Sequence, residues 1–335
     1  MKLIVQIPCY NEAEHLPDTL AAIPRQVRGA DSVEVLVIDD GSEDDTTAVA
    51  LAHGADAVLR FPGRQGLARV FRAGIDASIR AGADIIVNTD GDNQYDGSEI
   101  PRLVAPILAG NADMVVGDRD PGTLSHFSMA KRLLQRLGSW LMRRLSNTTV
   151  ADSTSGFRAY SREAALRLNV INDFTYTLET LIQAGNRRMR IADVPIKARQ
   201  TPRKSRLAPT MFHYLKNAGG TMARAYAMYE PMKVFFYAAA IFLLGAAAIG
   251  VRFLFFYFGP TSGTGNVQSL ILAAILAIVG FQLLSLGLVA DLMAANRKLL
   301  EEQLYRLRRQ DSRDLGVDGL ASLPGMTTTG EGHSG

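Results

Sequence analysis

The chain has 335 residues, 47% of them hydrophobic, and a formal net charge of +3. The basic excess is slight, and nucleic acid is not an expected partner. The single cysteine, Cys9, excludes an intramolecular disulfide and favours a reducing compartment. The apolar run at residues 1–8 is followed directly by polar residues, which is typical of a buried first strand and not of a cleavable signal peptide.

Short apolar runs alternate with amphipathic segments through the first 120 residues. Runs rich in Val and Ile predict strands at residues 2–7, 33–38, 84–88 and 114–116. The segments between them predict helices at residues 13–22, 44–53, 67–80 and 99–108, with Ser42 as the N-cap of the second. This alternation predicts an α/β fold with a doubly wound, mainly parallel sheet. Ligands bind such sheets outside the carboxyl ends of the strands.

An acidic motif, Asp-Gly-Asp-Asn-Gln, follows the third predicted strand at residues 90–94. Its two carboxylates concentrate negative charge that a hard divalent cation, Mg²⁺ or Mn²⁺, would neutralise. Asp90, Asp92 and Gln94 are therefore the candidate metal ligands. A turn with solvated carboxylates is the alternative, but a second acidic pair ends another predicted strand, which favours a metal–nucleotide site.

Two further motifs indicate a resemblance to a known protein family. The sequence reads Ile-Pro-Cys-Tyr-Asn-Glu at residues 7–12 and Val-Ile-Asp-Asp-Gly-Ser at residues 37–42. With the Asp-x-Asp motif, they resemble the inverting glycosyltransferase family 2, whose members have the GT-A fold. Taken singly, the first motif could be strand-end packing and the second an Asx turn with a helix cap. Their order and spacing favour the family.

The resemblance implies a donor site built from these motifs. Pro8 and Tyr10 would pack against the nucleotide base, and Asp39 would accept a hydrogen bond from it. Glu12 would lie near the ribose or the phosphates. In the Asp-x-Asp motif, Asp92 would bind the metal and also act in catalysis. Asp90 would contact the nucleoside or the metal. Gly91 would complete the donor site.

Motifs later in the chain narrow the branch. Val-Val-Gly-Asp-Arg at residues 115–119, Asp-Ser-Thr-Ser-Gly-Phe-Arg at 152–158 and Val-Pro-Ile at 194–196 resemble polyprenyl-phosphate glycosyltransferases, the dolichyl-phosphate mannose synthase group and its bacterial relatives. The resemblance covers roughly residues 2–230. The chain departs from the mannose synthases at residues 118, 131 and 199–206. The segment at residues 174–180 is closer to prokaryotic relatives that use UDP-sugars.

The resemblance implies metal-dependent, inverting transfer of a sugar from a nucleotide-sugar to a polyprenyl or dolichyl phosphate. A UDP-sugar such as UDP-glucose or UDP-N-acetylglucosamine is favoured, and GDP-mannose is the alternative donor. A polysaccharide synthase would carry Gln-x-x-Arg-Trp, whereas the lone tryptophan, Trp140, lies in Gly-Ser-Trp. A non-catalytic membrane scaffold, the last alternative, would not need the acidic pairs. A homo-oligomer is left open.

Cations after the predicted sheet bear on the acceptor, because arginine can chelate two phosphate oxygens. An ordinary basic stretch beside the membrane is the alternative. Asp152 is the candidate carboxylate near the acceptor, either as base or as the orienting partner of an arginine, and Glu179 is its rival. The predicted acceptor-phosphate residues are Arg119, Lys131, Arg199, Arg203, Ser205 and Arg206.

Two long uncharged runs near the C-terminus, at residues 234–251 and 267–290, are each about the length that spans a bilayer. Basic residues flank the pair on both outer sides, so the positive-inside rule places the catalytic domain in the cytoplasm. The sequence thus predicts a GT-A domain (1–210), an interfacial amphipathic helix (211–232), a transmembrane hairpin (233–290), a basic cytoplasmic helix (291–310) and a disordered tail (311–335).

Overall fold

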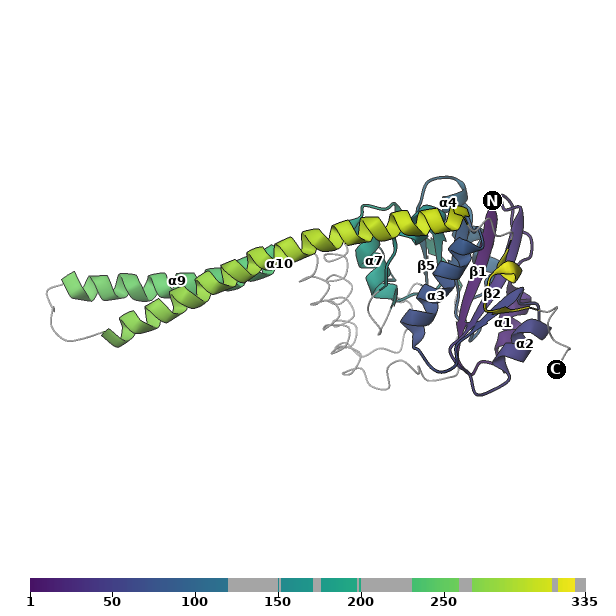
Figure 1. The fold of residues 1–335 in the computed structure, drawn as a ribbon, viewed down its shortest axis with the longest axis horizontal. Coiled ribbons are helices and arrows are strands. Elements are labelled where there is room, and N and C mark those ends of the chain that lie inside the picture. The colour runs from purple at the N-terminus through teal and green to yellow at the C-terminus, as the bar shows by residue number, and fades with distance from the viewer. Residues whose placement is uncertain are drawn as a thin grey trace. The chain divides into compact units, whose positions relative to one another are not determined.

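A computed structural model describes residues 1–119, 150, 152–170, 176–197, 199, 231–258, 267–314 and 319–328 (Figure 1). The chain divides into two compact units. The first, here called the sheet unit, contains Met1–Thr221 and Gln303–Gly335. The second, here called the hairpin unit, contains Met222–Glu302.

An eight-stranded sheet forms the centre of the sheet unit, in the spatial order β7-β5-β6-β4-β1-β2-β3-β8. β1 pairs in parallel with β2 and β4, β2 with β3, and β5 with β7. β6 is antiparallel to β4 and β5, and β8 is antiparallel to β3. The strands are β1 (Lys2–Cys9), β2 (Ser32–Asp39), β3 (Ala57–Arg60), β4 (Ile85–Asn88), β5 (Met114–Asp118), β6 (Arg158–Ser161), β7 (Ile191–Pro195) and β8 (Met326–Thr327).

Helices cover both faces of the sheet, because successive strand side chains point to opposite sides. In β1, Leu3 and Val5 pack into the core beneath α1 (Leu16–Ala22), α2 (Thr46–Ala52) and α4 (Ile100–Leu108). Ile4 packs into the opposite core, beneath α3 (Leu67–Arg80), α6 (Arg162–Arg167) and α7 (Tyr176–Asn186). A short 3₁₀ turn, η1 (Gly97–Glu99), precedes α4.

This architecture confirms the predicted fold class, and α3 has the predicted bounds. The strands β3, β6, β7 and β8 were not predicted, because runs of two to five residues carry little periodicity. The predicted N-cap of α2 is wrong. Asp45 occupies that position, while the Ser42 hydroxyl accepts a hydrogen bond from the backbone N–H of Asn11 at 2.9 Å.

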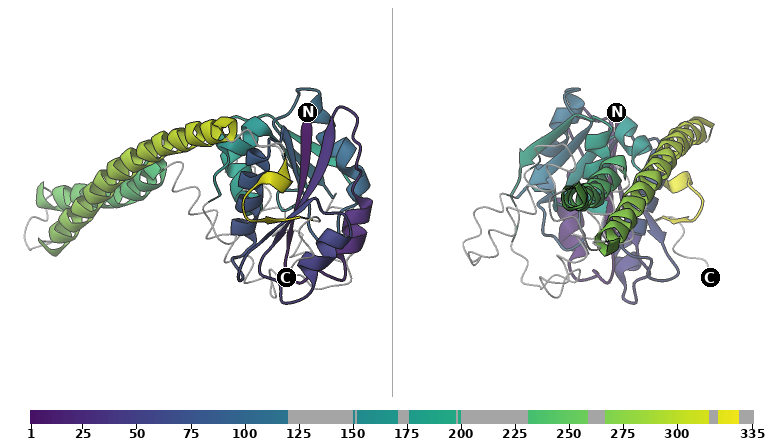
Figure 2. Two further views of the ribbon diagram at one scale, coloured as in Figure 1. Left: turned by 45° about the vertical axis from the view of Figure 1, so that its right-hand side comes forward. Right: turned by 90° about the vertical axis from the view of Figure 1, so that its left-hand side faces the viewer.

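The hairpin unit contains α9 (Pro231–Phe258) and most of α10 (Val267–Asp314), both long and apolar enough to cross a membrane. The two helices run side by side (Figures 1 and 2). Small residues let them approach, since a Cβ on Gly280 would lie 2.7 Å from Leu243 Cγ. Ala239 is fully buried in the unit. Of the predicted interfacial helix, residues 211–230 lie outside the described part of the chain.

The C-terminal segment, defined here as residues 303–314 and 319–328, belongs to the sheet unit. Tyr305, Leu320 and Leu323 are buried in the core that α3 covers. β8 pairs with β3 and forms that edge of the sheet, and η3 (Leu320–Ser322) precedes it (Figure 2). The predicted disordered tail is therefore wrong for residues 311–314, which end α10, and for residues 319–328, whose two leucines bury apolar surface. The predicted basic helix is instead the end of α10, where Arg308 pairs with Asp76 at 3.1 Å.

Candidate active site

The paired carboxylates at the end of β2 are buried and bonded to the surrounding backbone. Asp39 is fully buried, and its Oδ1 accepts the backbone N–H of Ser42 at 2.8 Å. Its Oδ2 accepts the Thr47 hydroxyl at 2.5 Å and lies 3.6 Å from Nε of Arg60. The carboxylate predicted to read the base thus also holds the turn that follows β2.

Asp40 holds a second loop, at residues 61–66, which joins β3 to α3 and is here called the 61–66 loop. Its Oδ1 accepts the backbone N–H of Gln65 at 2.5 Å, and its Oδ2 accepts that of Gly66 at 3.0 Å. Gly41 has φ of +72°, and a Cβ there would lie 2.6 Å from the backbone of Gly63. The motif at residues 37–42 therefore needs glycine so that the two loops can meet.

A pocket of about 590 Å³ opens beside these two loops. Tyr10, at the end of β1, contributes its ring, and the Arg64 guanidinium carbon lies 4.6 Å from the ring centroid. A pocket at the carboxyl ends of parallel strands is where this class of sheet binds ligands. Its lining residues are Tyr10, Gly41, Ser42, Glu43, Arg60, Phe61, Pro62, Gly63 and Arg64.

The other predicted donor residues at the end of β1 are mostly covered. Pro8 is buried within the strand and pairs with Ile38 of β2. Glu12 is 8% exposed, and its backbone N–H donates to the Thr46 hydroxyl at 3.0 Å. Tyr10 is the predicted residue that reaches the pocket lining directly.

The Asp-x-Asp motif follows β4 and packs against the end of β1. A Cβ on Gly91 would lie 2.8 Å from Cys9 Sγ, so glycine lets the backbone pass close to the strand. The Gly91 carbonyl accepts the Thr19 hydroxyl at 3.2 Å. Asp92 Oδ1 accepts the backbone N–H of Gln94 at 3.1 Å, so the candidate ligand Gln94 is fixed beside Asp92.

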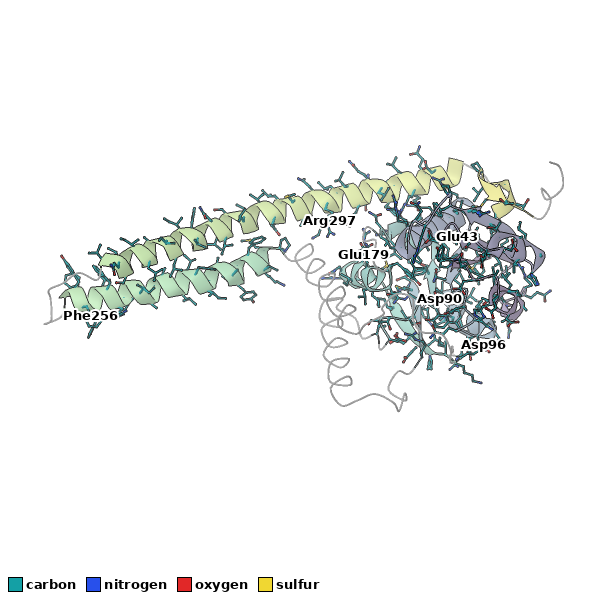
Figure 3. The ribbon with its side chains drawn as sticks, turned by 90° about the horizontal axis from the view of Figure 1, so that it is seen from below. Glu43, Asp90, Asp96, Glu179, Phe256 and Arg297 are labelled. Atoms are coloured by element: carbon teal, nitrogen blue, oxygen red, sulfur yellow. The ribbon has the colours of Figure 1, made fainter. Side chains whose placement is uncertain are left out.

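Asp90 is half-buried and belongs to the sheet unit (Figure 3). Burial and, next, the nearby charge of Asp92 raise the pKa of Asp90 to about 7. Asp90 also crowds Gly156, where a Cβ would lie 2.9 Å from Asp90 Oδ1. Two neighbouring carboxylates with this mutual repulsion are the chemistry that a divalent cation relieves.

The donor set fits a hard cation. Asp90, Asp92 and Gln94 supply oxygen atoms, which Mg²⁺ and Mn²⁺ prefer. Among the described residues, no group of three His, Cys, Asp or Glu side chains forms a closed metal cage. Two carboxylates and an amide leave coordination positions for phosphate oxygens, which is how Mg²⁺ is commonly held in phosphate chemistry.

Arg119 and Asp152 form an ion pair, which unites two residues predicted separately. Arg119 donates from Nε to Asp152 Oδ2 at 2.6 Å and from Nη2 to Oδ1 at 3.1 Å. Burial favours the neutral acid, but the hydrogen bonds and charge of Arg119, together with the hydrogen bonds from Thr154, outweigh it and hold the pKa of Asp152 below its usual value. The rival carboxylate Glu179 lies on α7 and accepts from Gln183 Nε2 at 3.2 Å (Figure 3). This arrangement favours Asp152 as an orienting partner over Asp152 as a base.

Arg199, predicted to hold the acceptor phosphate, contacts the Asp-x-Asp motif. Its Nη1 donates to Asn93 Oδ1 at 2.7 Å, and its Nη2 lies 3.5 Å from Asp96. Its backbone N–H donates to the Gln94 carbonyl at 2.9 Å. The remaining predicted acceptor residues lie outside the described part of the chain: Lys131, Arg203, Ser205 and Arg206.

Arg158 at the start of β6 was not singled out by the sequence analysis. It is fully buried and donates to the carbonyls of Ser155 and Ser153 at 2.7 and 2.8 Å. On α7 it donates to the Thr177 carbonyl at 2.7 Å. A buried arginine with this set of carbonyl partners fixes the segment that carries Asp152, and its place in the motif at residues 152–158 was the available signal.

Arg60 and Arg64 were also missed, because both belong to a part of the chain where no strand was predicted. The Pro-Gly-Arg-Gln-Gly run at residues 62–66 was the available signal, since such runs form tight loops between elements.

Comparison with known proteins places the chain in a family. The profile of glycosyl transferase family 2 matches residues 4–168. The chain is 30% identical over 206 residues to the polyprenol monophosphomannose synthase of Mycolicibacterium smegmatis, covering 58% of this chain and 76% of that protein. It is 32% identical over 212 residues to the dolichyl-phosphate hexose transferase of Haloferax volcanii, covering 62% of this chain and 87% of that protein.

The fold has solved counterparts. Glucosyl-3-phosphoglycerate synthase from Mycobacterium tuberculosis, crystallised with Mn²⁺, UDP and its glucosylated product, superposes with a TM-score of 0.52 at 23% identity. The superposition covers 68% of this chain and 79% of that one. The motifs, the sheet with its pocket and these likenesses agree: the chain is a glycosyltransferase that belongs to glycosyl transferase family 2.

Proposed function

We propose that this glycosyltransferase moves a sugar from a nucleotide-sugar to the phosphate of a polyprenyl-phosphate lipid. The observation that carries the proposal is one sheet edge with three features: the pocket beside Tyr10, the Asp-x-Asp oxygens and the Arg119–Asp152 pair. Two long apolar helices follow the same domain. The names of the relatives support a lipid phosphate as acceptor.

In this proposal the pocket holds the nucleoside, with Tyr10 against the base and Asp39 behind it. Asp92, Asp90 and Gln94 would hold Mg²⁺ or Mn²⁺, which supplies Lewis-acid stabilisation of the departing diphosphate. Arg119, oriented by Asp152, binds the acceptor phosphate. Its Nη1 takes no part in the bonds to Asp152.

The reaction needs little proton transfer. A phosphate oxygen of the acceptor attacks the anomeric carbon, the bond from that carbon to the diphosphate oxygen breaks, and the nucleoside diphosphate leaves with inversion. The second pKa of a phosphomonoester is about 6, so the acceptor is already ionised near neutral pH. Asp152 as an ion-paired orienting group, without a strong base, suits this chemistry.

The donor is proposed as a UDP-sugar, on the sequence of residues 174–180. The name of the mycobacterial relative supports the second candidate, a mannose donor such as GDP-mannose. We further propose that α9 and α10 span the membrane and that the sheet unit lies in the cytoplasm. The C-terminal end of α10 belongs to the sheet unit, as expected if the hairpin returns to the side from which it started.

Donor screening tests the proposal. Purified full-length chain is incubated with UDP-glucose, UDP-N-acetylglucosamine or GDP-mannose, Mn²⁺ and a short polyprenyl phosphate, and lipid-linked sugar is measured. We expect one donor to give a metal-dependent lipid product. Transfer to a soluble sugar or phosphoglycerate acceptor, with none to the lipid phosphate, would refute the proposed acceptor.

A further inference from the structure

Two guanidinium groups line the pocket, and they have different surroundings. Arg60 lies 3.6 Å from Asp39 and donates to the Ser42 carbonyl at 3.1 Å. The Arg64 side chain is exposed, and within the described residues its guanidinium group lies over the face of the Tyr10 ring. Arg60 is thus held by Asp39 and Ser42, whereas the exposed Arg64 side chain can exchange the Tyr10 ring for another partner.

The proposed donor brings two needs to this pocket. Its base needs an aromatic face, and Tyr10 offers one that the Arg64 guanidinium partly covers, 4.6 Å from the centroid. Its diphosphate needs cations in addition to the metal. A cation–π contact at an exposed site is weaker than a hydrogen bond between two charged groups, such as one from arginine to phosphate. Exchange of the ring for the phosphate is therefore favourable.

The 61–66 loop holds Arg64 close to the motif that binds the donor. Asp40 accepts backbone N–H groups from the two residues that follow Arg64. Its Oδ1 accepts from Gln65, and its Oδ2 accepts from Gly66. The close approach of Gly63 to Gly41 fixes the residue before it. The backbone of Arg64 is fixed at both sides while its side chain remains exposed.

We propose that Arg64 is a donor-binding residue that leaves the Tyr10 ring for the diphosphate when the nucleotide enters, with Asp40 as the positioning residue of its loop. This inference rests on the proposed function, because it assumes that the pocket takes a nucleoside diphosphate.

Calorimetry on the full-length protein with UDP and with uridine, each in the presence of Mn²⁺, tests it. The ratio of the uridine Kd to the UDP Kd isolates the contribution of the diphosphate. In Arg64→Gln we expect this ratio to fall by about tenfold to a hundredfold, with uridine affinity unchanged or higher. Arg64→Lys should recover part of the ratio, because it keeps the charge but loses the bidentate geometry.

Arg80→Gln is the matched control, since Arg80 ends α3 about 20 Å along the helix from the loop. An unchanged ratio in Arg64→Gln would overturn the inference, whether the affinities for UDP and uridine stay the same or fall equally. If the wild-type protein binds GDP and not UDP, the same comparison is made with GDP and guanosine. Wild-type protein that binds neither diphosphate would refute the proposed function itself, which separates the two failures.

Discussion

At the scale of single residues, the charges of the site are arranged in unequal pairs. Asp90 is half-buried beside Asp92, and this environment raises its pKa to about 7. Asp152 is also largely covered, yet its pKa is held below the usual value by Arg119. We propose that a divalent cation completes the first pair, whereas the second pair is complete within the protein.

Asp92→Asn should abolish metal-dependent transfer while the fold is kept. Removing one carboxylate from a hard-cation site lowers metal affinity and leaves the diphosphate charge without a partner. We expect at least about a hundredfold loss of transfer, together with weakened Mn²⁺ binding measured by electron paramagnetic resonance in the presence of UDP. Undiminished turnover at limiting Mn²⁺ would show that Asp92 is not a ligand.

Asp152→Asn and Arg119→Gln should be strongly non-additive. If Asp152 acts by orienting Arg119, each single variant loses the same acceptor contact, and the double variant is about as active as either single one. Because the folded-state pKa of Asp152 is lowered, the ion pair stabilises the folded protein at neutral pH. This contribution to the free energy of unfolding is lost as the pH falls below about 4. A full multiplicative loss in the double variant would instead indicate an independent role for Asp152.

At the scale of elements, the short pieces of the sheet unit carry much of its organisation. β3 has four residues, yet it places Arg60 beside Asp39 and leads into the 61–66 loop. β8 has two residues, and it covers the edge of β3. The backbone N–H of Leu320 donates to Glu34 at 3.1 Å, which fixes the start of this cover on β2.

Deletion of residues 319–335 should therefore destabilise the sheet unit. Leu320 and Leu323 are 1% and 6% exposed, and burial of a leucine side chain contributes roughly 1.5–3 kcal/mol. We expect a loss of about 3 kcal/mol in the free energy of unfolding, measured by urea denaturation in detergent. Deletion of residues 329–335 is the control, and equal stability of both deletions would show that the segment contributes nothing.

At the scale of the whole molecule, the catalytic domain is not continuous in sequence. Residues 303–314 lie beyond the hairpin, yet Tyr305 donates to Glu163 at 2.9 Å and Arg308 donates to the Leu168 carbonyl at 2.7 Å. An anchor that simply followed the catalytic domain could be removed at residue 230 without consequence for the fold. The contacts of the C-terminal segment predict a cost.

A chain of residues 1–230 should be less stable than one in which a flexible linker of about 20 residues joins 230 to 303 in place of the hairpin. The linked chain retains the site and the C-terminal segment, so we expect it to transfer sugar to a short-chain prenyl phosphate. With long-chain lipid it should lose efficiency, because membrane residence raises the local acceptor concentration. Melting temperature and transfer to both acceptors are measured. A folded linked chain that binds donor but is inactive on every acceptor would place the hairpin in the acceptor site.

The sequence by itself determined the fold class, the strand ends that carry the carboxylates and the family. These depend on local periodicity and on motifs whose residues are adjacent in the chain, as in Asp39–Asp40 and the Asp-x-Asp motif. It also determined the two apolar helices, because their length exceeds what a soluble helix requires.

Only the tertiary structure decided which distant groups meet. Asp152 lies 33 residues from Arg119, and β8 pairs with a strand more than 260 residues earlier. Nothing local in the sequence marks such pairs, since a two-residue strand has no periodicity and an ion pair has no spacing rule. The packing of the sheet unit selects them, because Asp152 and Leu320 are buried there beside the groups that complement them.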